Sequence, residues 1–322
     1  MNGMSSEQLL VRASTGDCVE AGTRLMGLLG ADIRHADLAF AFNNRLLSYW
    51  GRRFVYVPYS VPPEALERAI EGIRALDILA CNVTFPHKVP IMRYLDEVDE
   101  TTRRMGSVNL VVNREGVLRG YNTDSLGFMD ALRATGLMDE LDSALIYGAG
   151  GAGRALATAL TAAGMRQIWM YDVIGVRSHE VESRLNTNGC RVCAVGREDL
   201  GDLRPALIVN ATPLGRREQA DRSPLDAAHT GTARAARLFF DLNYNPPRSR
   251  FLEQARALGV AAENGLRMMC YQAKHSIDIA AGSEVPWDWF HRALKEWEVQ
   301  RHTVAAGGVT PFERADPGLV TE

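Results

Sequence analysis

Residues 144–172 read ALIYGAGGAGRALATALTAAGMRQIWMYD. An apolar run leads into a glycine-rich turn, which is followed by an alanine-rich segment of helical periodicity and a second apolar run ending in Asp172. This order predicts a strand, a tight turn, a helix and a second parallel strand. Glycines let the backbone turn sharply and approach a pyrophosphate, whose charge is met by the N–H groups at the start of the helix. The stretch therefore predicts a Rossmann-like dinucleotide-binding domain rather than a glycine turn that serves only helix packing.

The acid at the end of the second strand bears on the choice of cofactor. Asp172 stands 19 residues after Gly153, close to where an acid that recognises the adenosine ribose is expected. A carboxylate there accepts hydrogen bonds from a free 2′-hydroxyl and repels a 2′-phosphate. We therefore expect NAD rather than NADP, although Arg177 stands near enough in sequence to reach a phosphate.

Outward from this stretch, apolar runs alternate with helical segments over most of the chain, which is typical of parallel α/β proteins. The pattern predicts an α/β fold of two domains. Residues 1–125 would form an N-terminal α/β domain that binds substrate, and residues 126–265 a Rossmann-like NAD(P)-binding domain. We expect two helices within 266–303 to return to the first domain, and residues 304–322 to form a flexible tail.

Composition excludes several classes of function. The chain has 322 residues, with 36 Lys plus Arg against 39 Asp plus Glu. Its net charge of −3 therefore indicates neither nucleic acid nor an anionic membrane as a binding partner. We expect a cytoplasmic protein, because no signal peptide or 18-residue apolar segment is evident. Five cysteines form no disulfide or zinc pattern, so no metal is expected. The expected partner is a small molecule, and a monomer and a homodimer both remain open.

Lysine is rare in this chain, since only Lys88, Lys274 and Lys295 are present. Lys88 ends the segment NVTFPHK, which starts at Asn82 and leaves an apolar run. Further polar groups follow predicted strands in the segments GSVN (106–109), GYNTD (120–124), NATPLG (210–215), DLNYNP (241–246) and GL (265–266) with Gln272 beyond. Taken in order together with the GAGGAG turn, these segments resemble the shikimate/quinate dehydrogenase family over about residues 23–283.

The resemblance implies a two-domain NAD(P)-dependent oxidoreductase that interconverts a cyclic secondary alcohol and its ketone, of the shikimate or quinate type. Lys88 and Asp124 would be the catalytic pair, because hydride leaves the carbinol carbon only as the hydroxyl proton is removed. Either member can be the proton acceptor. The implied substrate-binding residues are Thr84, Asn109, Tyr244 and Gln272. The implied cofactor-binding residues are Gly148, Ala149, Gly150, Gly151, Ala152, Gly153, Asp172, Asn210, Thr212, Leu242 and Gly265.

One loop departs from the family pattern GxPIxHSxSPxxHN, in which two serine hydroxyls hold the substrate carboxylate. Here residues 30–43 read GADIRHADLAFAFN, so Ala36 and Leu38 stand at the serine positions. Losing two hydrogen bonds to a carboxylate weakens binding by roughly two to four powers of ten. Arg34 is a candidate replacement, since a guanidinium binds carboxylates well. A milder departure is Arg216, which follows NATPLG where methionine is usual.

These departures leave three hypotheses for function. The first is turnover of shikimate, quinate or a near relative, and the second is the same chemistry on a different cyclic polyol. The third is a dinucleotide-binding sensor without turnover. The Lys88/Asp124 pair disfavours a sensor, because a site that has lost its catalytic activity has no need for a buried charged pair. The alternatives to a catalytic role are purely structural: Lys88 would be a solvated lysine in the first turn of a helix, and Asp124 would cap a helix.

Overall fold

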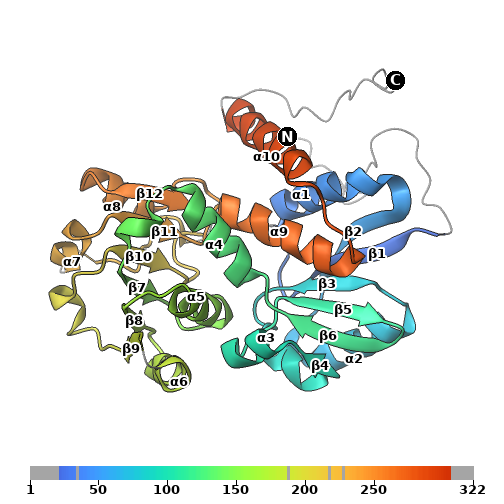
Figure 1. Ribbon diagram of the computed structural model, residues 1–322, viewed down its shortest axis with the longest axis horizontal. Helices are drawn as coiled ribbons and strands as arrows, with labels where there is room; N and C mark the ends of the chain where they lie inside the picture. The colour runs from blue at the N-terminus through green and yellow to red at the C-terminus, as the bar shows by residue number, and fades with distance from the viewer. Residues whose placement is uncertain (1–21, 34–35, 187–188, 217–218, 227–228, 306–322) are drawn as a thin grey trace, which may run out of the picture.

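The computed structural model describes residues 22–33, 36–186, 189–216, 219–226 and 229–305, and it consists of two α/β domains side by side (Figure 1). Each domain is built on a six-stranded sheet. The N-terminal domain lies on the right of Figure 1 and the Rossmann-like domain on the left. The predicted two-domain α/β fold is confirmed.

The N-terminal sheet is mixed, with strand order β2-β1-β3-β5-β6-β4. Strand β1 pairs in parallel with both β2 and β3, whereas β5 is antiparallel to both of its neighbours. The strands are β1 (Arg24–Gly30), β2 (Phe54–Ser60), β3 (Ala80–Val83), β4 (Glu97–Val98), β5 (Leu110–Arg114) and β6 (Val117–Tyr121). The chain leaves β1 for β2 on one side and returns to β3 on the other, so a crevice opens between the carboxyl ends of β1 and β3.

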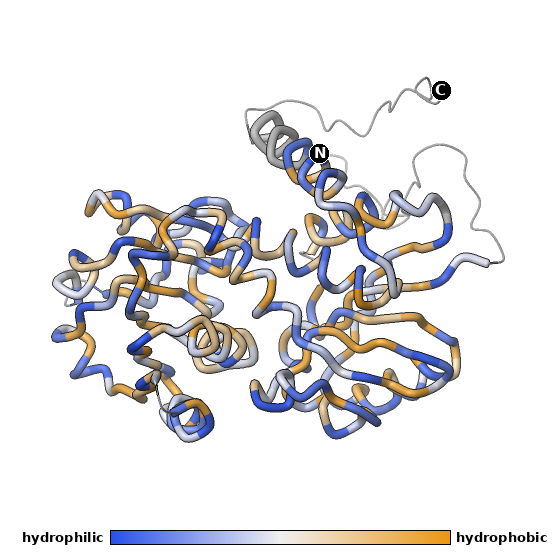
Figure 2. The backbone as a smooth tube through the Cα atoms, in the orientation of Figure 1, coloured by the Kyte–Doolittle hydropathy of each residue, from blue (hydrophilic) through white to orange (hydrophobic). Residues whose placement is uncertain are grey.

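The helices of this domain cover the sheet with apolar faces. In α2, for example, the buried residues Leu66, Ile70 and Ile73 repeat at helical spacing. The helical elements are α1 (Asp37–Leu47), η2 (Ser48–Arg53), η3 (Pro63–Ala65), α2 (Leu66–Ala75), η4 (Pro90–Tyr94) and α3 (Glu100–Met105). The tube in Figure 2 shows the apolar residues gathered on the inner strands and the polar residues on turns and outer helices.

The Rossmann-like sheet is wholly parallel, with strand order β12-β11-β10-β7-β8-β9. Its strands are β7 (Ser143–Tyr147), β8 (Gln167–Tyr171), β9 (Arg191–Ala194), β10 (Leu207–Asn210), β11 (Leu238–Asp241) and β12 (Ala261–Asn264). Its helical elements are η5 (Met138–Glu140), α5 (Gly151–Ala162), α6 (Gly175–Leu185), η6 (Leu200–Asp202), α7 (Thr230–Arg234) and α8 (Arg250–Ala257). The order reverses between β7 and β10, which creates a second crevice at their carboxyl ends.

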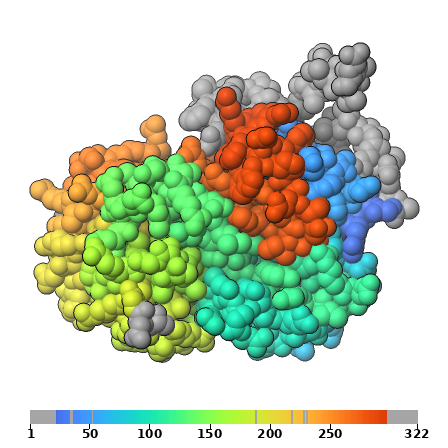
Figure 3. Space-filling view, in the orientation of Figure 1, coloured from blue at the N-terminus to red at the C-terminus, as the bar shows by residue number. Residues whose placement is uncertain are grey.

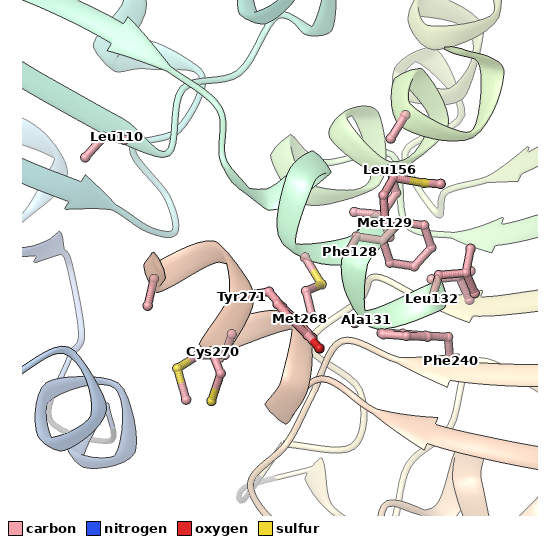
Figure 4. Packing of buried hydrophobic residues seen from close by; sticks show 14 of the residues in the cluster. Leu110, Phe128, Met129, Ala131, Leu132, Leu156, Phe240, Met268, Cys270 and Tyr271 are labelled. Carbon is pink, nitrogen blue, oxygen red and sulfur yellow. The ribbon is translucent and has the colours of Figure 1, made fainter. Parts of the chain in front are cut away.

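Helices α4 (Asp124–Ala134) and α9 (Leu266–Ala281) connect the two domains and pack closely on each other. Gly127 makes this possible, because a Cβ there would lie 2.5 Å from the backbone nitrogen of Gln272. On the other side of α4, the rings of Phe128 and Phe240 lie 5.0 Å apart (Figure 4). One continuous apolar cluster therefore runs from α1 through α4 and α9 into the Rossmann-like sheet.

Helix α10 (Trp287–Ala305) packs on α1 of the N-terminal domain, as Figure 3 shows for the red and blue residues. The rings of Phe42 and Phe290 meet edge to face at 6.2 Å. Lys274 is buried where α9 turns into α10, with its Nζ 2.5 Å from Asp278 Oδ2 and 4.2 Å from the centre of the Trp287 ring. Lys274, the second of the three lysines, thus stabilises the junction of α9 and α10.

Two negative observations concern the described part of the chain. None of its helices is long and apolar enough to cross a membrane. No group of three His, Cys, Asp or Glu residues within it is arranged to hold a metal ion. The predicted tail lies, beyond Ala305, outside the described residues.

Candidate active site

The two crevices face one another across a cavity of about 450 Å³. Residues that follow β1 and β3 line one side, and residues that follow β10 and β11 line the other. Nine of the residues predicted from the sequence line this cavity: Thr84, Lys88, Asn109, Asp124, Ala152, Leu242, Tyr244, Gly265 and Gln272. The fold therefore brings together side chains that lie far apart in the sequence.

Lys88 and Asp124 form an ion pair in the cavity, with Nζ 2.5 Å from Oδ2. The side chains are 19% and 8% exposed, so the pair is shielded but still reachable from the cavity. The other carboxylate oxygen, Asp124 Oδ1, accepts a hydrogen bond from Asn109 Nδ2 at 2.9 Å. Both oxygens of Asp124 are thus engaged, and Lys88 is held in one place. A solvated lysine and a simple helix cap do not describe this arrangement.

Behind the pair lies a chain of buried hydrogen bonds that crosses from α4 to α9 and the sheet. The backbone N–H of Thr123 donates to Asn109 Oδ1 at 2.6 Å, and Thr123 Oγ1 lies 2.8 Å from Ser276 Oγ. Ser276 Oγ also accepts from Asn82 Nδ2 at 2.8 Å. Because every step joins a different element, the network fixes the orientation of Asn109 and, through it, of Asp124.

Tyr56 ends this network at the cavity wall. Its hydroxyl donates to Asn82 Oδ1 at 3.0 Å. Burial raises the pKa of Tyr56 well above its usual range, and the neighbouring Cys81 and Tyr244 act in the same direction. Tyr56 is therefore a neutral hydrogen-bonding group at any physiological pH. His87, adjacent to Lys88 in sequence, is buried and places its Nε2 2.7 Å from the carbonyl of Val61, away from the pair.

The glycine-rich turn fits a dinucleotide. Gly148 has a φ of +98°, and a Cβ at Gly153 would lie 1.9 Å from the carbonyl oxygen of Gly148. Gly150 is different, because a Cβ there would meet nothing within 4 Å, so the backbone is open to a ligand. No side chain caps the start of α5, which leaves its first N–H groups available to an anion. Within the turn, Gly150 is thus the position at which a ligand can approach the backbone closely.

Gly151 serves the junction of the two domains. A Cβ on Gly151 would lie 3.0 Å from Lys88 Cβ, so the lysine packs directly against the first turn of α5. The carbonyl of Gly151 accepts a hydrogen bond from Ser107 Oγ at 2.9 Å. Lys88 and the glycine-rich turn are therefore neighbours.

Asp172 is occupied by the backbone of its own domain. Oδ2 accepts from the N–H of Ala149 at 2.8 Å and Oδ1 from the N–H of Ile174 at 2.8 Å. One carboxylate thereby ties the glycine-rich turn to the turn after β8. Its presence is explained by this structural bond, with no need for a ribose.

The turns after β10 and β11 are held together by buried polar side chains. Asn210 is fully buried, accepting from Thr212 Oγ1 at 2.6 Å and donating to Asp241 Oδ1 at 3.0 Å. Asp241 also accepts from Ser249 Oγ and from Asn243. Burial raises the pKa of Asp241 to about 6, although these hydrogen bonds oppose the rise. Asn210 thus shapes the cleft from behind and, being fully buried, does not line it.

The predicted replacement for the serines, Arg34, lies outside the described residues. Of the two residues at the serine positions, Ala36 lines the cavity, whereas Leu38 packs on the apolar core. From the sequence, no role is predicted for Asn82, Asp241 or Asn243, although all three lie in the motifs NVTFPHK and DLNYNP, and Ser276 is missed altogether. Two signals were available, because Asn82 interrupts a buried apolar strand and Ser276 follows Gln272 by one helical turn.

A shielded Lys–Asp pair beside a Rossmann-like turn in a cleft between two domains is the arrangement expected of a dinucleotide-dependent oxidoreductase. Residues 28–111 match the family model described as the shikimate dehydrogenase substrate binding domain. A shikimate dehydrogenase (NADP(+)) from Symbiobacterium thermophilum is 35% identical over 275 residues, covering 82% of this chain and 91% of that protein. The chain belongs to the shikimate dehydrogenase family. It is an NAD(P)-dependent oxidoreductase acting on a CH–OH group.

Solved structures agree with this assignment. The shikimate 5-dehydrogenase of Thermus thermophilus in complex with NADP(H) and shikimate aligns with a TM-score of 0.74 at 32% identity, covering 85% of this chain and 100% of that one. The enzyme of Listeria monocytogenes in complex with shikimate and NAD aligns with a TM-score of 0.75 at 28% identity, covering 87% of this chain and 99% of that one.

The predicted preference for NAD over NADP is wrong. The Symbiobacterium relative and further relatives, one of them from Methanopyrus kandleri, are named for NADP(+), and the Thermus structure contains NADP(H). The physical reason for the error is that both carboxylate oxygens of Asp172 accept hydrogen bonds from backbone N–H groups. An acid at the expected spacing therefore need not face the ribose.

Proposed function

We propose that the chain interconverts shikimate and 3-dehydroshikimate with NADP as its cofactor. The observation that carries this proposal is the Lys88–Asp124 pair, held by Asn109 in a cavity that the glycine-rich turn adjoins. Support also comes from the relatives, which are named as NADP(+)-dependent shikimate dehydrogenases. Arg177, exposed in the first turn of α6, is our candidate for the 2′-phosphate.

In this proposal the residues of the chain manage a proton. When the ring hydroxyl of the substrate is oxidised, its proton passes to the Lys88–Asp124 pair, and it returns to the ketone oxygen in the reverse direction. Bound nicotinamide supplies the hydride chemistry by accepting the hydrogen of the carbinol carbon with its electron pair. Asn109 holds Asp124 so that Lys88 stays next to the reacting oxygen.

The remaining cavity residues orient the ring. Thr84 and Gln272 present a hydroxyl and an amide to the cavity that holds the Lys88–Asp124 pair, and Tyr244 lines the wall formed after β11. Asn109 Nδ2 lies 3.4 Å from Gln272 Oε1, so the amide of Gln272 is coupled to the same network. Leu242, Gly265 and Ala152 form the apolar side of the cavity on the Rossmann-like domain, where a nicotinamide ring would lie.

A second candidate is the same reaction on a cyclic polyol without a carboxylate, or on quinate. The observation in its favour is that Ala36 brings a methyl group, and Asp32 an acid, to the wall formed after β1. An acid on that wall disfavours an anionic group beside it.

The test is the formation of reduced nicotinamide with shikimate and with quinate, each assayed with NADP and with NAD. We expect turnover of shikimate with NADP. Both cofactors are included because the Listeria structure contains NAD. Turnover confined to quinate or to a neutral polyol would transfer the assignment to the second candidate. Binding of NADP with no turnover of any of these substrates would instead favour a sensor.

A further inference from the structure

The cavity contains a second cation, Arg216, whose surroundings differ from those of Lys88. Lys88 is neutralised by Asp124 at 2.5 Å. No carboxylate within the described residues pairs with Arg216, and its side chain has one hydrogen-bond partner there, since Nε donates to Asn243 Oδ1 at 2.9 Å. The guanidinium is tethered through Nε, which leaves its terminal nitrogens for another acceptor.

The tether is rigid. Asn243 Nδ2 donates to the carbonyls of Thr212 and Leu214 at 3.1 and 2.9 Å, and to Asp241 Oδ1 at 2.9 Å. The amide of Asn243 therefore cannot turn, and its oxygen is fixed toward Arg216 Nε. A guanidinium held in this way is prepared for a planar oxyanion at little entropic cost.

The position of Arg216 indicates which end of the ligands it meets. It follows β10, whose neighbours are β7 and β11, whereas Asp172 follows β8 on the far side of β7. A dinucleotide with its pyrophosphate at the start of α5 has its adenosine on the β8 side and its nicotinamide toward β10 and β11. Arg216 and Lys88 line the same cavity, so Arg216 lies near the meeting point of nicotinamide and substrate.

The segment between β1 and α1, on the opposite wall, offers no alternative anchor among its described residues. The described residues between β1 and α1 that line the cavity are Ala31, Asp32, Ile33 and Ala36. Three of these are apolar, and Asp32 is an acid that already takes part in an interaction of its own. A substrate carboxylate therefore meets neither a hydroxyl nor a cation from these four side chains.

We propose that Arg216 binds the carboxylate of the substrate and thereby selects anionic cyclic polyols. This inference rests on the proposed function and names the residue that gives it its substrate class. A guanidinium at this place also suits a phosphate of the dinucleotide, which is the other oxyanion in the reaction. The experiment must therefore separate the two sources.

The test compares Arg216→Met, Arg216→Lys and a control, Arg222→Met, on shikimate and on its uncharged methyl ester. Arg222 is exposed and lies outside the cavity, 3.4 Å from Gln219 Oε1. We expect Arg216→Met to lower kcat/KM for shikimate about 10- to 100-fold, to change that for the ester less than about threefold, and to leave the KM for NADP unchanged. Arg216→Lys should restore part of the rate, and the control should behave as wild type.

Three results would overturn the inference: an equal loss for acid and ester, no loss for either, or a raised KM for NADP with an unchanged ratio of acid to ester. The last result would assign the guanidinium to a cofactor phosphate. Calorimetric titration of NADP-loaded protein with acid and ester separates this inference from the proposed function. A wild type that turns over shikimate while Arg216→Met keeps its preference for the acid contradicts this inference alone. A wild type that binds neither compound contradicts both proposals.

Discussion

The two crevices that form the cavity achieve their geometry by opposite means. On the N-terminal side, polar side chains define the geometry. Lys88, Asp124 and Asn109 are fixed by hydrogen bonds that extend to Ser276 and Asn82. On the Rossmann-like side, the important feature is the lack of a side chain at Gly148, Gly150, Gly151 and Gly153. The N-terminal crevice is therefore sensitive to lost functional groups, and the Rossmann-like crevice is sensitive to added atoms.

The largest effect is expected on the side-chain crevice. Lys88→Ala should lower kcat by about 10²- to 10⁴-fold, because the proton of the substrate hydroxyl loses its acceptor. Affinity for NADP, measured by fluorescence titration, should stay unchanged. Lys295→Ala, on the exposed surface of α10, is the control with full activity. A variant at position 88 that keeps more than about a tenth of the wild-type kcat would show that Lys88 is not the proton acceptor.

The glycine crevice should respond to single methyl groups, and differently at two positions. Gly150→Ala meets no protein atom, so it should leave stability unchanged while raising the KM for NADP about 100-fold through loss of the close backbone approach. Gly153→Ala would clash with the Gly148 carbonyl and should lower the free energy of unfolding by about 3 kcal/mol. Urea unfolding and steady-state kinetics measure both. If Gly150→Ala leaves the KM unchanged, the pyrophosphate does not lie there.

Asp241 joins the turns behind the Rossmann-like crevice and should make stability depend on pH. Its pKa is raised to about 6, so the folded state binds this proton more tightly than the unfolded state does. Its contribution is fully present below about pH 4 and is lost as the pH rises through 6, a change of up to about 3 kcal/mol.

In Asp241→Asn the amide can donate to Ser249 Oγ in place of the proton, and the titration disappears. Relative to wild type, this variant should therefore gain free energy of unfolding between pH 4 and pH 7, as measured by urea titration at both values. The comparison with wild type matters because Asp96, Asp130 and Asp142 have lowered pKa values and act in the opposite direction. A difference between the two proteins that is the same at both pH values contradicts the prediction.

The smallest effect should come from the far end of the side-chain network. Ser276→Ala removes two buried hydrogen bonds, to Asn82 and Thr123, and should cost about 1–2 kcal/mol of unfolding free energy. It should lower kcat only a few-fold, since the Lys88–Asp124 contact itself remains. Ser183→Ala, on an exposed face of α6, is the matched control. A loss of kcat as large as that of Lys88→Ala would mean that Ser276 takes part in proton transfer directly.

Much of the site could be predicted because strand ends converge. Lys88 and Asp124 each follow a strand of one sheet, and the family motifs placed them in order before any contact was known. The network behind them could not be predicted, because Asn82 and Ser276 are 194 residues apart and meet only where α9 packs across the sheet. The NAD preference predicted from Asp172 was wrong for a related reason. Sequence spacing gives the position of a carboxylate along the chain, whereas packing decides which group donates a hydrogen bond to it.

Local sequence was enough to predict the two α/β domains and the glycine-rich turn, and the order of the motifs pointed to Lys88 and Asp124 as the candidate catalytic pair. These depend on local properties, namely apolar periodicity, the absence of a Cβ and the chemistry of single side chains. Long-range packing, by contrast, makes Asp172 join two turns, brings Lys88 against Gly151 and places Arg216 at the cavity. Hydrogen bonds and close contacts depend on separations of about 3 Å, and these are set by how helices and sheets pack rather than by distance along the chain.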